Sequence, residues 1–199
     1  MEIRTSTSHP LRIDWVQPKQ SNGLVGMVLC PGKTDHGATG FWERDLDMDL
    51  KVAANEGASI IVSLIEDREF ELLQVPYFGE AVVRQGMKWL HLPIPDQQSP
   101  DDDFETNWFC RSGREIKQSI DDGHNILLHC RGGLGRTGTI AAKLLFEYGE
   151  HPERAIDLVR EARGDEYARK NTIENKIQEG YIRSLNRRLS SLTPNGDSP

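Results

Sequence analysis

A cysteine and an arginine, Cys130 and Arg136, are separated by five residues, three of which are glycines. A cysteine thiolate is a strong nucleophile, and a guanidinium group can bind a phosphate through two parallel hydrogen bonds. The backbone N–H groups of a glycine-rich loop can also face one concavity and bind an anion there. This spacing therefore indicates a site for nucleophilic attack on a bound phosphate group.

The segments on either side of this loop predict its place in the fold. Residues 125–128 form a short apolar run typical of a buried strand, and the apolar spacing of residues 139–148 predicts a helix. A loop that leads from the carboxyl end of a strand into a helix lies at the positive end of the helix dipole. That position favours a bound anion and a cysteine thiolate.

The residues around the cysteine resemble the signature of a known superfamily. The order His-Cys-x5-Arg-Thr, here His129, Cys130, Arg136 and Thr137, is similar to that of the cysteine-dependent protein-tyrosine and dual-specificity phosphatases. Residues 133–138 most resemble the branch of the cyclin-dependent-kinase-associated phosphatase. Rhodanese-like domains share the Cys-x5-Arg spacing, so the histidine, the glycines and the threonine carry the resemblance.

The chemistry of this loop and the resemblance together suggest residue roles in a two-step hydrolysis. Cys130 is expected to be the nucleophile, and Thr137 to donate its hydroxyl to the sulfur. The resemblance implies that His129 orders the loop and helps to lower the cysteine pKa. The phosphate-binding residues are expected to be Arg131, Gly132, Gly133, Leu134, Gly135 and Arg136.

The general acid is predicted to be Asp96. Three prolines prevent residues 93–100 from forming a helix or a central strand, so they form a loop. The stretch Pro93-Ile94-Pro95-Asp96 is similar to one that carries the acid in the resembling branch. The competing candidate is the acidic cluster of residues 101–103, whose simpler interpretation is a helix cap.

Two further residues are assigned supporting roles. Gln178 is a candidate for positioning the hydrolytic water, as a glutamine does in tyrosine-specific members of the superfamily; the alternative is a surface glutamine on the last helix. Arg131 is expected to tune substrate choice, because it adds a second positive charge at the loop. This chemistry calls for no metal ion and no organic cofactor.

Strands and helices alternate along the chain, which predicts an α/β domain with a central, mostly parallel sheet flanked by helices. The resemblance to dual-specificity phosphatases extends over about residues 24–189 and implies the same fold. The expected strands are residues 24–29, 59–65, 88–92 and 125–128; the expected helices are about 43–55, 70–73, 77–85, 101–120, 139–148, 152–159 and 173–189. Residues 1–20 are predicted to be an irregular lead-in, 21–189 the phosphatase domain and 190–199 a disordered tail.

Three local expectations concern the surroundings of the site. Residues 37–42 are predicted to be a loop with aromatic residues beside the active site, either for substrate recognition or with no more than a structural role. The helix of residues 43–55 should present Leu46, Leu50 and Ala53 on one face, and should point Asp45, Asp47 and Asp49 elsewhere. Cys110 is expected to be a small core residue.

The composition narrows the function classes. Of 199 residues, 37% are apolar and 28% are charged, and no apolar run approaches the roughly 20 residues of a membrane span. The formal net charge of −7 argues against non-specific nucleic-acid binding. The three cysteines, Cys30, Cys110 and Cys130, form no disulfide framework and no metal motif. A catalytic thiolate needs a reducing compartment, so a cytoplasmic location is expected. A disulfide from Cys130 to either other cysteine under oxidation stays open.

These observations predict a phosphoprotein phosphatase that hydrolyses phosphotyrosine, phosphoserine or phosphothreonine through a cysteinyl-phosphate. The chain lacks a tyrosine-recognition segment before the loop, which favours a shallow pocket. The alternatives are a phosphatase of a phosphoinositide, nucleotide or small-molecule phosphate, and a phosphoprotein-binding module without turnover. The expected partner is a phosphorylated protein, with a protein kinase as one candidate.

Overall fold

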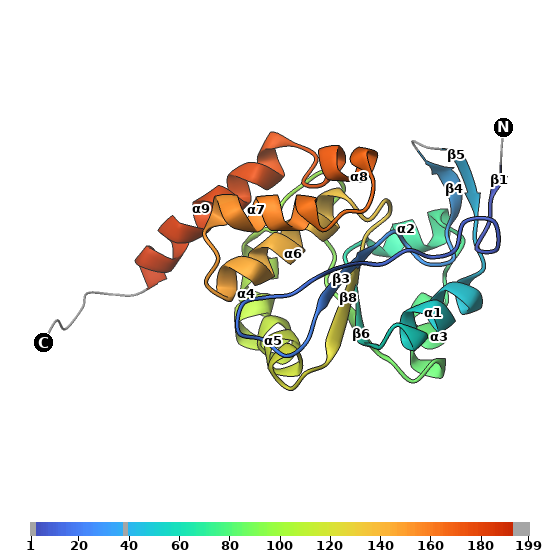
Figure 1. The fold of residues 1–199 in the computed structure, drawn as a ribbon, viewed down its shortest axis with the longest axis horizontal. Helices are drawn as coiled ribbons and strands as arrows, with labels where there is room; N and C mark the ends of the chain where they lie inside the picture. Colours follow the sequence, from blue (N-terminus) through green and yellow to red (C-terminus); the bar gives the residue numbers. More distant parts are fainter. Residues whose placement is uncertain (1–2, 38–39, 193–199) are drawn as a thin grey trace, which may run out of the picture.

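The computed structural model describes residues 3–37 and 40–192, and its core is a five-stranded sheet (Figure 1). The strand order is β2 (Asp14–Val16), β3 (Val25–Val28), β8 (Asn125–His129), β6 (Ala58–Ser63) and β7 (Lys88–His91). The last four strands are parallel, and β2 pairs antiparallel with β3 at the edge. The prediction of an α/β fold with a mostly parallel sheet is therefore confirmed. The central strands β6 and β8 are mostly apolar and buried, as expected for parallel strands covered by helices on both faces.

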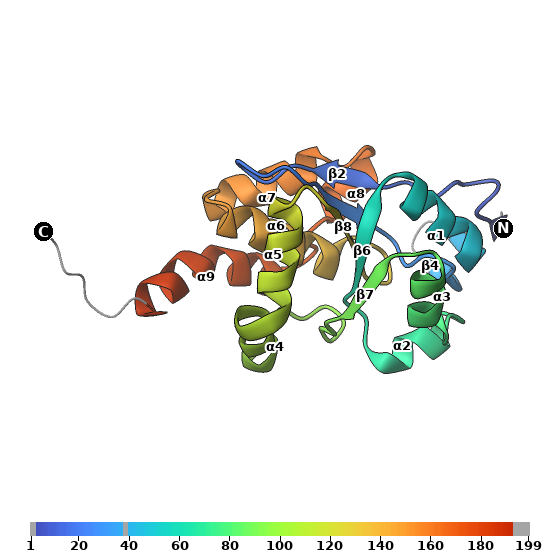
Figure 2. The ribbon, with the colours of Figure 1, turned by 90° about the horizontal axis from the view of Figure 1, so that it is seen from below.

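Helices lie on both sides of this sheet (Figure 2). On one side α1 (Leu46–Asn55) contacts β6, and α3 (Phe78–Arg84) contacts β7. On the other side α5 (Gly113–Asp121) and α6 (Gly135–Glu147) contact β8, and α7 (Pro152–Glu161) and α9 (Lys176–Leu192) pack against α6. Within residues 3–37 and 40–192, none of the helices combines the length and the apolar character that crossing a bilayer requires.

Short elements complete the fold and refine several expectations. A second sheet joins β1 (Ile3–Arg4), β5 (Gly40–Glu43) and β4 (Thr34–Gly37), so part of the loop predicted at residues 37–42 is a β-hairpin; residues 38–39 lie outside the described residues. The predicted lead-in contains β1 and β2. The last helix, α9, includes the first three residues of the predicted tail, and residues 193–199 lie outside the described part. The remaining helices are α2 (Asp67–Leu72), α4 (Asp102–Asn107) and α8 (Glu166–Asn171).

The helix predicted at residues 101–120 is present but interrupted. A π-helical turn, Trp108–Ser112, separates α4 from α5, and a methyl group added at Gly113 would lie 2.6 Å from the Trp108 ring. Asp101 caps α4 by accepting a hydrogen bond from the backbone N of Phe104 at 2.8 Å, which agrees with the helix-cap interpretation of this acidic cluster. Cys110 is exposed, so its prediction as a core residue is wrong.

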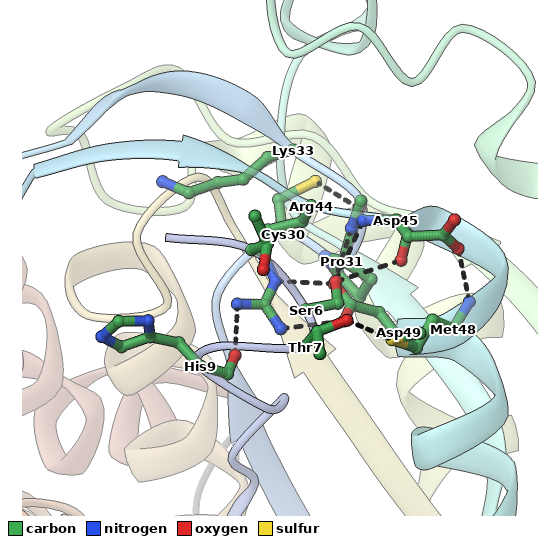
Figure 3. Close-up of polar contacts among 12 residues, drawn as sticks. Ser6, Thr7, His9, Cys30, Pro31, Lys33, Arg44, Asp45, Met48 and Asp49 are labelled. Atoms are coloured by element: carbon green, nitrogen blue, oxygen red, sulfur yellow. Dashed lines mark hydrogen bonds and ion pairs between the residues drawn. The ribbon is translucent and has the colours of Figure 1, made fainter. Parts of the chain in front are cut away.

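A buried ion pair joins the start of α1 to the N-terminal segment (Figure 3). The Arg44 guanidinium donates to both carboxylate oxygens of Asp49, at 2.7 and 2.8 Å, and these side chains are 1% and 0% exposed. Arg44 also donates to the carbonyl of His9, and Asp49 accepts from the backbone N of Gly32. The expectation that Asp49 points away from the core is therefore wrong, because Arg44 supplies its counter-charge.

We expect Asp49→Asn to lower the free energy of unfolding by about 3 kcal/mol, since it leaves the buried Arg44 charge without its partner. Urea unfolding followed by circular dichroism measures this loss. Asp47→Asn is the matched control, because Asp47 is exposed on the same helix and its loss should change stability by no more than about 0.5 kcal/mol. Equal stability of the two variants would contradict the assignment.

Candidate active site

The glycine-rich loop connects β8 to α6, as the sequence predicts. Cys130 follows directly after β8 and is 4% exposed. Gly133 has a φ of +74°, and a methyl group on it would lie 2.5 Å from the backbone of Val28 and Leu29. Only glycine allows both this conformation and this close approach. The loop therefore lies directly against β3, with its sulfur at the carboxyl edge of the sheet.

Arg136 is buried beneath the loop and paired with a carboxylate. Its Nη1 and Nη2 donate to the two oxygens of Glu69 at 2.6 and 2.8 Å, and Nη1 also donates to the carbonyl of Ile94 at 3.1 Å. Burial opposes its charge, but the Glu69 hydrogen bonds and the charge of Cys130 outweigh that effect and raise the pKa of Arg136. Burial likewise would raise the pKa of Glu69, and the hydrogen bond from Arg136 lowers it overall. Arg136 is thus a fixed cation.

Asp96 lies beside Arg136, on the proline-rich loop. Its Oδ1 is 3.1 Å from Arg136 Nη2, and its side chain is 49% exposed. The loop is held by α9 and the residues before it: Asn175 Nδ2 donates to the carbonyl of Gln97 at 2.9 Å, and Gln178 Nε2 to that of Gln98 at 3.4 Å. The structure therefore brings the predicted acid to the predicted phosphate site, while the rival cluster serves as a cap.

His129 belongs to a chain of buried hydrogen bonds that ends at the loop. Trp89 Nε1 donates to Ser63 Oγ at 2.8 Å, and Ser63 Oγ lies 2.6 Å from His129 Nε2. His129 Nδ1 lies 3.3 Å from the carbonyl of Cys130, which can only accept, so Nδ1 carries the proton. Burial, aided by the nearby charge of Arg136, lowers the pKa of His129 to about 3. The imidazole is therefore uncharged at neutral pH, and its part in ordering the loop stays a prediction.

Arg131 is held at the edge of the site by the β4–β5 hairpin. Its Nε donates to Asp35 Oδ2 at 2.8 Å, and Lys33 Nζ lies 2.9 Å from Asp35 Oδ1. Lys33 Nζ also lies 5.6 Å from the centre of the Trp42 ring. The Asp35 carboxylate thus binds both Arg131 and Lys33. Arg131 lines the cavity, and its predicted effect on substrate choice stays a prediction.

These groups surround one cavity of about 270 Å³. Cys130, Arg136 and Asp96 all line it. Besides the loop residues, Leu29 and Gln97, the lining comes from the β4–β5 hairpin with the residue before it, from α8 and from the segment before α9. From these come Lys33, Asp35, His36, Gly37, Trp42, Tyr167 and Glu174. The cavity therefore joins the predicted nucleophile, cation and acid.

Two predicted site residues, Gln178 and Thr137, are buried, and the structure does not show their predicted roles. Gln178 is fully buried rather than at the surface, and its amide accepts from the backbone N of Glu174 at 3.0 Å. Thr137 Oγ1 is buried and has no hydrogen-bond partner among the described residues, so its proton is not committed elsewhere. The predicted role of Gln178 in positioning the hydrolytic water and that of Thr137 as a hydrogen-bond donor to the sulfur stay predictions.

The other cysteines differ in their relation to the loop. Cys30 is buried, and its backbone N donates to the carbonyl of Arg131 at 3.3 Å. Burial is the main cause of its raised thiol pKa, to which the charge of Cys130 contributes. Cys110 lies on the π-helical turn. A disulfide of Cys130 with either residue stays an open prediction.

Two residues that hold the loop were missed from the sequence. Glu69 accepts a hydrogen bond from the backbone N of Glu66 at the start of α2, but glutamate is not among the residues that typically mark a helix start, so the sequence gives no clear signal. Arg163, buried at the end of α7, donates to the carbonyl of Gly133 and to Thr172 Oγ1, and lies 3.2 Å from Asp14. No local pattern marks Arg163, because its partners come from distant parts of the chain.

Comparison with known proteins gives one family match. Residues 37–150 match the model of the family described as "Polymorphic toxin system, DSP-PTPase phosphatase". Cyclin-dependent kinase inhibitor 3 of Rattus norvegicus is 25% identical over 193 residues, which cover 95% of this chain and 85% of the relative. RNA/RNP complex-1-interacting phosphatase of Mus musculus is 33% identical over 153 residues, 76% of this chain and 45% of that protein.

Solved structures share the fold. A kinase associated phosphatase, with its catalytic-site cysteine substituted by serine, superposes with a TM-score of 0.77 at 24% identity and covers 92% of this chain and 97% of its own. Tk-PTP in its active form gives a TM-score of 0.62 at 25% identity, over 85% of this chain and 98% of its own. These likenesses confirm the arrangement of sheet and helices.

Glu69→Ala should destabilise the protein by about 3 kcal/mol, because it leaves the buried Arg136 charge without its main counter-charge. Inorganic phosphate at the loop would supply a new anion. We therefore expect added phosphate to raise the melting temperature more in Glu69→Ala than in the wild type. Glu71→Ala, on the exposed side of the same helix, is the control. A smaller phosphate effect in Glu69→Ala would argue against this pairing.

Stability should fall as the pH falls from about 6.5 towards about 3, because the unfolded chain protonates His129 in that range and the folded chain does not. Between pH 6.5 and 5 the loss from this residue is about 1.6 kcal/mol. Urea unfolding at both pH values should show a weaker pH dependence in His129→Asn. The exposed His124 offers a control, His124→Asn, which should keep the wild-type dependence.

Proposed function

The chain belongs to the polymorphic-toxin-system DSP-PTPase phosphatase family, a family of cysteine-dependent phosphatases, and from this premise we propose that Cys130 is its nucleophile and Asp96 its general acid. The protein is a phosphoprotein phosphatase of the tyrosine and dual-specificity type. The observation that carries the residue assignment is the convergence of Cys130, Arg136 and Asp96 on one cavity.

In the first step the Cys130 thiolate attacks phosphorus in line, and the bond to the leaving oxygen breaks. Protonated Asp96 gives its proton to that oxygen. The phosphoryl oxygens would accept hydrogen bonds from Arg136 and from the backbone N–H groups of residues 131–136, which would stabilise the charge that develops on them. Because Glu69 fixes the guanidinium, little reorganisation accompanies the reaction.

In the second step a water molecule attacks the cysteinyl-phosphate. The S–P bond breaks, the thiolate leaves, and the Asp96 carboxylate takes one proton from the water. Thr137 can donate its uncommitted hydroxyl to the departing sulfur. The products are inorganic phosphate and the enzyme in its starting form.

The proposed substrates are phosphotyrosine and phosphoserine or phosphothreonine in proteins. The two cations on the cavity wall, Lys33 and Arg131, share the Asp35 carboxylate. This sharing leaves less positive charge than a multiply phosphorylated inositol headgroup would require, so a phosphoprotein is favoured over a phosphoinositide. Parallel assays with phosphopeptides and phosphoinositides distinguish the two classes.

The names of the relatives suggest a type of partner. Because cyclin-dependent kinase inhibitor 3 and a kinase associated phosphatase are similar to this chain, a phosphorylated protein kinase is the partner that we propose to test first. A cytoplasmic location is part of the proposal, since a reducing compartment keeps the thiolate free.

Hydrolysis of nitrophenyl phosphate without added metal tests the two assignments. Cys130→Ser should abolish turnover, because an alkoxide is not available at neutral pH. Asp96→Asn should lower kcat at least a hundredfold with phenyl phosphate, whose leaving group needs the proton, and less with nitrophenyl phosphate, whose leaving group does not.

Asp103→Asn is the matched control for the acid, because Asp103 belongs to the rival acidic cluster and is exposed. Its activity should stay within about twofold of the wild type. Full activity of Cys130→Ser would refute the thiolate mechanism, and loss of activity in Asp103→Asn alone would move the acid to that cluster.

A further inference from the structure

The catalytic cavity contains a second carboxylate, Glu174, that the two-step mechanism does not yet use. Glu174 lies between α8 and α9 and lines the same cavity as Cys130, Asp96 and Arg136. A methyl group added at Gly135, the first residue of α6, would overlap the Glu174 carboxylate. Glu174 therefore borders directly on the loop that holds the phosphate.

The backbone around Glu174 is held in place from both sides. Its backbone N donates a hydrogen bond to Gln178 Oε1 at 3.0 Å. Gln178 is the buried glutamine predicted as a candidate for positioning the hydrolytic water, and this contact engages its side-chain oxygen. Just before it, Ile173 has a φ of +57°, a strained conformation for a β-branched residue. The carbonyl of Ile173 accepts from Arg160 Nη2 at 3.3 Å. Two hydrogen bonds and one strained residue thus hold this segment beside the cavity.

The Glu174 carboxylate itself makes no hydrogen bond and no ion pair with any of the described residues. Its two oxygens are available to a molecule in the cavity. Glu174 is an exposed residue at the mouth of the cavity, but its carboxylate is partly desolvated where it meets the loop. This partial desolvation raises the pKa of Glu174, the charge of Asp96 raises it further, and Arg136 acts in the opposite direction. A carboxylate with unused acceptors, beside a cation and a second carboxylate, has the means to bind water.

We propose that Glu174 is a catalytic residue that orients the water in the second step, an inference that rests on the proposed cysteinyl-phosphate mechanism. A water molecule has two O–H groups. One proton passes to Asp96 as oxygen attacks phosphorus and the S–P bond breaks; the other O–H donates a hydrogen bond to Glu174. With both O–H groups held, a lone pair of the oxygen faces phosphorus. Gln178 supports Glu174 and does not touch the water.

The test is the fraction of enzyme trapped as cysteinyl-phosphate. Each protein is mixed with nitrophenyl phosphate, quenched with acid and examined by mass spectrometry, and kcat and kcat/KM are measured in parallel. In Glu174→Ala we expect kcat to fall about tenfold, kcat/KM to stay within about threefold, and the phosphoenzyme to accumulate. Glu174→Gln, which still accepts a hydrogen bond, should recover a large part of kcat.

Two companion variants separate the failure of this inference from failure of the proposed function. Asp96→Asn lacks the base of the second step and should accumulate the phosphoenzyme. If it accumulates none, the covalent mechanism itself is wrong. If Asp96→Asn accumulates it and Glu174→Ala does not, only the role of Glu174 is overturned. Glu166→Gln, an exposed carboxylate on α8, should behave as the wild type.

Discussion

A guanidinium group that is only 2% exposed must have a counter-charge within hydrogen-bond distance, and the active site of this phosphatase is built around that requirement. Glu69 meets it with both oxygens. The same side chain accepts from the backbone N of Glu66 at 2.8 Å and so fixes the start of α2. One carboxylate therefore sets the position of a helix and of the cation beneath the phosphate loop, and Asp96 in turn faces that cation.

The chemical centre could be predicted because its signals are local. Cys130 and Arg136 lie on one short loop between a strand and a helix, and three prolines identify the loop of Asp96. The partners of these residues could not be predicted in the same way. Glu69 and Arg163 reach the loop from α2 and α7, so their roles depend on how distant elements pack. Their charges alone suggest ordinary surface residues.

The errors have definite physical causes. Helical spacing predicts that Asp49 points away from the apolar face of its helix, but the ion pair with Arg44 allows this carboxylate to be buried. Cys110 lies two positions after the buried Trp108, which in a helix places it on nearly the opposite face. It is therefore exposed, although cysteine is small enough for a core position. Gln178 is buried because its amide joins two loop segments, a function that helical periodicity does not reveal.

The residues of the cavity come from different stretches of the chain. The family match, residues 37–150, contains Glu69, Asp96, Cys130 and Arg136. Part of the rim lies outside it: Lys33 and Asp35 precede the match, and Tyr167 and Glu174 follow it. In evolutionary terms, Lys33, Asp35 and Tyr167 can diverge while the reactive groups are inherited unchanged, because neither chemical step uses these three residues. A lineage of such enzymes can thus acquire new substrates without altering the groups that break the phosphate ester.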